Sequence, residues 1–160
     1  MTRKIKRYFY VALFPLIFVS CGGIFEDEFF GAKFGASKDE VREAFEKYSF
    51  IERGSDYSNI SFEKENEDNF SFKGFNWNTV AVGFNEIEEF CSVGFGYSTE
   101  NEDEAKKIFE KISKQYMNSK KIDEGDASNS DYVVKEDLKV TVTYFSLYSV
   151  YFVMLTYEKI

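Results

Sequence analysis

The sequence predicts an α+β fold in which two amphipathic helices pack on an antiparallel β-meander sheet. Three observations indicate it. Two segments repeat apolar residues at helical spacing, many others alternate with the two-residue period of strands, and no Pro follows position 15. Of the 160 residues, 44% are hydrophobic and 19% aromatic, so the chain can bury a core and is not disordered.

Both helical segments begin with a capping residue. Ser37 precedes Glu40 by three positions, which is the spacing of a capping box, and Asn101 precedes Glu104 in the same way. The apolar residues of the first segment share one face: Val41, Ala44, Phe45 and Tyr48. Those of the second segment do likewise: Ala105, Ile108, Phe109, Ile112 and Tyr116.

The remaining segments predict strands: residues 57–63, 69–73, 77–84, 90–97, 132–135, 138–145 and 148–157, with a short leading strand at 29–34. Residues 138–145 alternate strictly, which is typical of an antiparallel sheet with one wet face. The last strand is apolar on both faces, so we expect it to be central or to lie beneath a helix. Gly74 lies where the alternation changes phase, which predicts a bulge.

The two helical segments also resemble each other. Aligning Ser37 with Asn101 brings further residues into register, among them Glu40 with Glu104, Phe45 with Phe109 and Lys47 with Lys111. Strands follow each helix, so one interpretation is a helix-plus-meander unit used twice. The other is chance convergence, because all amphipathic helices share this pattern.

The first twenty residues have the layout of a secretory signal. A basic head, Arg3 to Arg7, precedes an uncharged apolar stretch at residues 8–19, which is shorter than the roughly 20 residues of a membrane-spanning helix. We therefore expect a signal peptide at 1–20, a tether at 21–28 and a single α+β domain at 29–160.

The end of this signal, Phe18-Val19-Ser20-Cys21, resembles the lipobox of bacterial lipoproteins, with Phe18 where that family usually has Leu. The resemblance implies diacylglycerol on the Cys21 sulfur, cleavage before Cys21 and acylation of the new amine, as with palmitate. It implies a membrane anchor in the cell envelope. Gly22 in place of Asp favours the outer membrane over the inner membrane. The acidic triplet at 26–28 is similar to the residues that accompany export to the cell surface in some bacteria, although a solvated linker is the alternative. The alternatives are an ordinary cleaved signal or an uncleaved anchor.

Charge limits the partners of the chain. The whole chain has 20 basic and 28 acidic residues. Removing residues 1–20 takes away four basic side chains and no acidic ones, which leaves 16 against 28, a net charge of −12. Phosphate backbones and anionic lipid surfaces repel such a chain, so we expect no nucleic-acid partner and membrane attachment through covalent lipid.

The sequence contains no motif of a catalytic, metal or cofactor site, although its Ser, Lys and many carboxylate residues leave a Lys-Ser dyad, a carboxylate pair or a weak ion site as alternatives. The chain has no His, which excludes imidazole catalysis and His-ligated metals. The polar linker-like segment 123–130 fails the spacing of a calcium-binding EF-hand loop. Once Cys21 carries lipid, Cys91 has no disulfide partner, and its apolar neighbours indicate a small buried hydrophobe.

Residues 30–41 place a short strand, Gly35 and a Ser-capped helix in succession, and they resemble the start of the repeats in β-lactamase-inhibitor-like and outer-membrane-assembly lipoproteins. That resemblance implies helices on an antiparallel sheet and a protein-binding rather than catalytic role. We expect a non-catalytic envelope lipoprotein that binds an envelope protein. The alternatives are a carbohydrate-binding or carbohydrate-processing accessory lipoprotein, and an inhibitor of a secreted enzyme.

The candidate binding surface comprises Phe75, Trp77 and Tyr97. Aromatic side chains beside Asn76 and Asn78 can stack on sugars or anchor a protein partner. The alternative is that these rings fill the core of the sheet. Exposure of all three on one face would favour a carbohydrate-binding protein or an inhibitor, and their burial would favour an assembly module.

Overall fold

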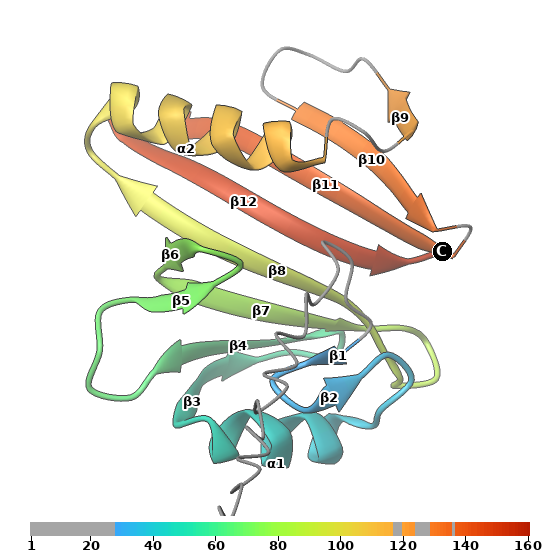
Figure 1. Cartoon of the computed structure of the whole chain (residues 1–160). Helices are drawn as coiled ribbons and strands as arrows, with labels where there is room; N and C mark the ends of the chain where they lie inside the picture. Colours follow the sequence, from blue (N-terminus) through green and yellow to red (C-terminus); the bar gives the residue numbers. More distant parts are fainter. Residues whose placement is uncertain (1–27, 117–119, 124–128, 136) are drawn as a thin grey trace, which may run out of the picture.

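The computed structural model describes residues 28–116, 120–123, 129–135 and 137–160 (Figure 1). Within these ranges the chain forms two helices, one eight-stranded antiparallel sheet and two small two-stranded hairpins. The predicted α+β class is therefore confirmed. The expected signal peptide and all of the tether except Glu28 lie outside the described residues, as do positions 124–128 of the polar segment.

Each helix precedes four strands of the large sheet in the chain. The first set is α1 (Lys38–Lys47), β3 (Phe50–Ser55), β4 (Asn59–Lys64), β7 (Thr79–Phe84) and β8 (Phe90–Thr99). The second set is α2 (Glu102–Gln115), β9 (Lys120–Asp123), β10 (Asn129–Lys135), β11 (Leu138–Leu147) and β12 (Val150–Lys159). The order across the sheet is β3-β4-β7-β8-β12-β11-β10-β9, so the last strands of the two sets pair at its centre.

Both predicted helices are present with their predicted caps. The Ser37 hydroxyl accepts a hydrogen bond from the Glu40 backbone, and the Glu40 carboxylate accepts one from the Ser37 backbone N–H at 2.8 Å. At the second helix the Asn101 side chain accepts from the Glu104 backbone N–H at 3.1 Å. These bonds satisfy backbone donors that the first turn of a helix leaves without partners.

Two predicted local features are wrong in detail because tight hairpins replace them. The leading strand at 29–34 is a hairpin of β1 (Glu28–Phe29) and β2 (Ala32–Lys33), with Phe30 and Gly31 at φ of 50° and 84° in the turn. Gly74 forms no bulge. With Lys73 it makes the two-residue turn between β5 (Phe70–Phe72) and β6 (Phe75–Trp77), where both turn residues have positive φ.

Two strands of the large sheet were not anticipated, and both lie at its edges. The small strand β6 was not anticipated either, because the predicted strand at 77–84 joined Trp77 to β7. β3 is exposed from its third residue onward, so it lacks the apolar alternation that identifies a strand. A register shift at Arg53 interrupts its pairing with β4, which is a common protection for an exposed edge. β9 is a four-residue strand at the opposite edge.

One face of the sheet carries the core. Helix α1 contacts β2 and β3, and α2 contacts β8, β11 and β12. The side chains beneath them are fully or almost fully buried: Ile60, Phe62, Val80, Val82, Val93, Phe95, Val140, Val142, Val153, Leu155 and Tyr157. The predicted central position of the last strand is confirmed, because β12 lies between β8 and β11.

Aromatic rings from the N-terminal hairpin fill the space between the two helices. Phe29 is fully buried, and its ring centroid lies 5.0 Å from that of Tyr157 on β12 and 6.2 Å from that of Phe90 on β8. Phe30 packs 5.3 Å from Phe45 of α1. Such pairs add to the burial of the ring itself, so the β1–β2 hairpin is fixed firmly against the core.

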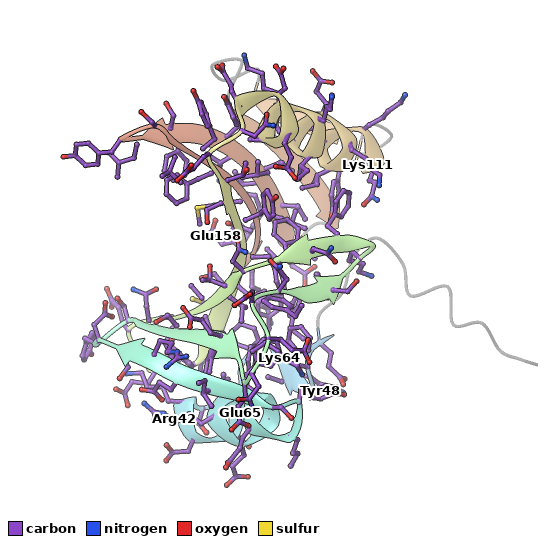
Figure 2. All side chains as sticks on the ribbon, turned by 90° about the vertical axis from the view of Figure 1, so that its left-hand side faces the viewer. Arg42, Tyr48, Lys64, Glu65, Lys111 and Glu158 are labelled. Carbon is purple, nitrogen blue, oxygen red and sulfur yellow. The ribbon has the colours of Figure 1, made fainter. Side chains whose placement is uncertain are left out.

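Polar contacts attach the first helix to its neighbouring strands. The Arg42 guanidinium of α1 donates to Glu52 of β3 at 2.8 Å. Lys64 of β4 donates to the carbonyl of Tyr48 just after α1, and the two residues lie together in Figure 2. Among the described residues, neither helix is long and apolar enough to cross a membrane.

Candidate functional site

The sequence-predicted surface of Phe75, Trp77 and Tyr97 does not exist as an exposed platform. Trp77 is completely buried, and its Nε1 donates to the Phe72 carbonyl at 3.0 Å. Phe75 is 6% exposed and lies under the Lys111 ammonium of α2, 5.1 Å from the ring centroid. The physical reason is the β5–β6 hairpin, which turns both rings of β6 toward the core.

Tyr97 lies on the helix-covered face as well. It is half-buried, and its hydroxyl donates to Glu104 of α2 at 3.0 Å. Burial, together with this hydrogen bond to a carboxylate, raises the pKa of the Tyr97 phenol. Tyr97 therefore fastens the start of α2 to β8, and it is the one residue of the predicted surface that also lines the open-face hollow described below.

Of the two cysteines, only Cys91 lies within the described residues. Cys21 lies outside the described residues, so its lipidation stays a prediction. Cys91 is partly buried on β8, and burial raises the pKa of its thiol. A raised pKa leaves less thiolate at neutral pH, which makes Cys91 a poor nucleophile and agrees with its interpretation as a packing residue.

The opposite face of the sheet is covered by neither helix. In Figure 2, Lys111 of α2 and Glu158 of β12 lie on either side of the strands in the upper part of the view. Strand pairing sets the residues of this open face in rows across the sheet. One row is Ser61, Ala81, Gly94, Thr156 and Thr141, and the next is Thr79, Gly96, Met154 and Thr143. Small residues therefore form most of the floor.

The small residues leave an apolar hollow of about 170 Å³ beside Phe152 and Met154. Gly94, Gly96, Thr79 and Ala81 contribute to its lining, which contains no carboxylate, amine or thiol. A side chain at position 96 would crowd this floor, because an added Cβ would lie 2.7 Å from the Thr79 Oγ1 atom and one of the two would have to shift. The hollow thus follows from sequence, and it suits an apolar side chain from outside.

An aromatic pair borders the hollow. Phe145 of β11 and Phe152 of β12 are directly opposite in the register, and their ring centroids lie 5.0 Å apart with the planes inclined by 12°. Phe145 remains 40% exposed, and the following Leu147 and Tyr148 are 54% and 92% exposed. No charged residue occurs between Lys139 and Glu158. This concentration of exposed apolar area on one hairpin is typical of an interaction surface.

The turn of this hairpin holds strained residues. Tyr148 and Ser149 have φ of 48° and 66°, the left-handed conformation that a two-residue turn needs and that Asn-Gly best supplies. A side chain costs about 1–2 kcal/mol there relative to the right-handed form. Packing of the Tyr148 ring offsets little of this conformational cost, because the ring is almost wholly exposed. Strain without a packing benefit is a reason to look for function at this turn.

Ion pairs flank the uncharged open face. Arg53 pairs with Glu63 at 2.7 Å on the β3–β4 side, and Lys139 pairs with Glu158 at 3.9 Å on the β11–β12 side. Beside the first pair lies a polar hollow of about 470 Å³. In the described part of the chain, no group of three or more Cys, Asp or Glu residues is placed to hold a metal ion.

Comparison with known proteins adds no relative: no family model matches the chain, and no curated protein or solved structure shows significant similarity to it. The description of the site therefore depends on its own geometry.

One sequence signal could have indicated the open-face site. The last strand is apolar on both faces, and its central position explains burial on only one of them. Val153 and Leu155 fill the covered face, whereas Phe152 and Met154 project onto the face that no helix covers. Sequence alone does not show which face of a sheet its helices occupy.

Proposed function

We propose that this protein is a lipid-anchored lipoprotein of the bacterial cell envelope that binds another protein through the open face of its sheet. The observation that supports it best is the hollow beside the stacked rings of Phe145 and Phe152 on a sheet face that no helix covers. Apolar anchors next to a pocket are what protein-binding hot spots require. The role is binding rather than catalysis.

The anchor is proposed from the N-terminal sequence. Lipid on Cys21 would hold the domain through the seven residues 21–27, which span at most about 25 Å when fully extended. That length keeps the domain next to the membrane. Attachment to the outer membrane or cell surface follows from Gly22 after the modified cysteine, and the acidic domain itself contributes no attraction to anionic lipid.

We also propose that the sheet consists of two helix-plus-meander units. Each helix precedes four strands, and the last strand of each set pairs with that of the other at the centre, β8 with β12. The aligned helix residues, such as Phe45 and Phe109, support a duplication. In this arrangement the hollow on the open face spans the junction of the two units.

The carbohydrate-binding alternative depended on exposed rings at Trp77 and Phe75. Both side chains are buried, so they cannot stack on a sugar. An inhibitor of a secreted enzyme would use the same open face as an assembly module. The proposed binding site is therefore common to both kinds of protein partner, and the partner's identity distinguishes them.

The proposal is tested in native cells with a tagged full-length chain and mild cross-linking. We compare wild type, Cys21→Ala, the double variant Phe145→Ser with Phe152→Ser, and Glu43→Gln on the exposed face of α1. Metabolic labelling with an alkyne fatty acid checks the lipid, which Cys21→Ala should lose. One envelope protein should be enriched with wild type and Glu43→Gln and lost with the double variant. Equal enrichment with the double variant would overturn the binding site, and labelling of Cys21→Ala would overturn the anchor.

A further inference from the structure

The end of the sheet at the β11–β12 turn combines apolar and acidic groups. Leu147 and Tyr148 at the turn are the apolar part. The acidic part is the start of α2, where Glu100, Glu102, Asp103 and Glu104 occur within five positions and all four are exposed. We name these two parts together the hairpin-tip surface.

The two parts lie at the same end of the sheet. Tyr151 of β12 lies opposite Thr99 of β8, the residue just before Glu100. The Tyr151 hydroxyl donates to the Glu102 carboxylate at 3.4 Å. Tyr148 at the turn is three positions before Tyr151, and Glu100 directly follows Thr99, so the turn and the acidic start of α2 lie at the same end of the sheet. Leu147 is two positions after Phe145 and so lies toward the open face, away from the face that α2 covers.

Internal contacts account for only part of this negative charge. Glu102 pairs with Lys106 at 2.6 Å, and Glu104 accepts from the hydroxyls of Tyr97 and Thr99. Glu100 and Asp103 add two further carboxylates at the rim. An apolar centre with an acidic rim is complementary to a surface with an apolar centre and a basic rim.

The position of the tip indicates a protein rather than the bilayer. The chain enters the domain at Phe29, whose ring contacts Tyr157 near the end of β12, as the place of β1 in Figure 1 also shows. Val150, at the turn, is seven residues earlier on the same strand, about 23 Å away along it. A tether that begins in the membrane thus reaches the domain at the end opposite the hairpin tip.

The following inference rests on the proposed function. We propose that the hairpin-tip surface binds a cationic segment of a partner protein, and that this segment carries an aromatic or aliphatic side chain at its centre. Tyr148 and Leu147 contact the apolar centre of that segment. Glu100 and Asp103 face its Lys or Arg residues, increase the association rate and set the orientation. The negative net charge of the mature chain disfavours a second copy as the occupant, because two acidic rims repel each other.

The test places a photoreactive phenylalanine analogue at position 148 of the full-length chain in native cells. Three backgrounds are compared: no other change, Glu100→Gln with Asp103→Asn, and the matched control Glu43→Gln with Glu46→Gln on α1. Mass spectrometry identifies the cross-linked peptide of the partner. We leave Glu102 and Glu104 unchanged because both have hydrogen-bond partners within the fold.

We expect an adduct with a protein segment of net positive charge that contains an aromatic or aliphatic residue. Its yield should fall at least about fivefold in the Glu100/Asp103 background and stay unchanged in the control, because opposite charges across an interface mainly govern encounter. An adduct with an acidic or neutral segment, with lipid or with a second copy overturns the inference, and so does an equal yield in both charge backgrounds.

A second position separates this inference from the proposed function. The same analogue at position 152 probes the hollow on the open face. Protein adducts at 152 without any at 148 overturn the cationic docking surface and leave the proposed function intact. The absence of protein adducts at both positions overturns both.

Discussion

The rings of Phe145 and Phe152 stack across the central hairpin, 5.0 Å between centroids, on the face of the sheet that no helix covers. A soluble domain gains stability when such a pair is buried, and here the pair borders an exposed hollow instead. We therefore separate residues whose burial stabilises the fold from residues whose exposure on the open face serves binding. The first three predictions below test that distinction.

The turn at Tyr148 and Ser149 should become more stable when its strained residues are replaced. The double variant Tyr148→Asn with Ser149→Gly supplies the preferred residues for two positive φ values, so the free energy of unfolding should rise by about 1 kcal/mol. Urea denaturation measures this. Partner cross-linking should fall at the same time, and a variant that is both more stable and fully active in binding would contradict a role for the turn.

Trp77 should contribute to stability and not to binding. Trp77→Ala removes a fully buried indole and its hydrogen bond to the Phe72 carbonyl, and should lower the free energy of unfolding by about 3–5 kcal/mol. Trp77→Phe keeps most of the apolar volume, so its loss should be clearly smaller. If Trp77→Phe remains folded yet loses the partner, our assignment of Trp77 to the core is incomplete.

Glycine at position 96 should be needed for the floor of the open face. Gly96→Ala places a Cβ 2.7 Å from the Thr79 Oγ1 atom, and should cost about 1–2 kcal/mol of stability. Thr79→Ala in the same chain removes that atom and should restore most of the loss. The matched control is Gly94→Ala, whose nearest contact would be 3.4 Å, and whose stability should change by less than about 0.5 kcal/mol. Thermal unfolding of the four chains provides the comparison.

The first capping box should make stability depend on pH in the acid range. Hydrogen bonds from the Ser37 backbone and hydroxyl lower the pKa of Glu40 below its ordinary value of 4.5. A carboxyl whose pKa is lower in the folded chain stabilises it above pH 4.5, and this contribution is lost as the pH falls through the folded-state pKa. Glu40→Gln cannot titrate, so it should lose less stability than wild type on acidification.

Denaturant midpoints at neutral pH and below pH 4.5 measure this difference. Glu43→Gln is the control, since Glu43 lies on the same helix and has no part in the cap. Equal acid sensitivity of Glu40→Gln and wild type would show that the capping box does not contribute through titration.

The elements that depend on local sequence patterns, such as helix caps and apolar spacing, could be predicted from the sequence. The helices follow from Ser37 and Asn101 as caps and from apolar spacing, and both were predicted at the observed positions. The edge strand β3 was missed because five of its six residues are not buried, so no alternation marks it. The Gly74 turn was mistaken for a bulge because both devices change the phase of alternation, and only the pairing of Phe72 with Phe75 distinguishes them.

The candidate site was predicted less well than the fold. Phe75 and Trp77 carry the residue types of a binding surface, but the β5–β6 hairpin turns them inward, and this depends on contacts distant in sequence. The residues of the open face were instead interpreted as parts of a buried strand. Their exposure depends on which face of the sheet α1 and α2 cover. No local sequence pattern near Phe152 indicates that face.

The most direct test of the central claim compares cross-linking from two faces of the molecule. A photoreactive phenylalanine analogue is placed at position 152 on the open face or at position 43 on α1, in the full-length chain in intact cells. We predict a discrete protein adduct at position 152 that is absent at position 43 and disappears when Gly94→Leu fills the hollow. Equal adducts at the two positions, or an adduct at 152 that Gly94→Leu leaves unchanged, would contradict it.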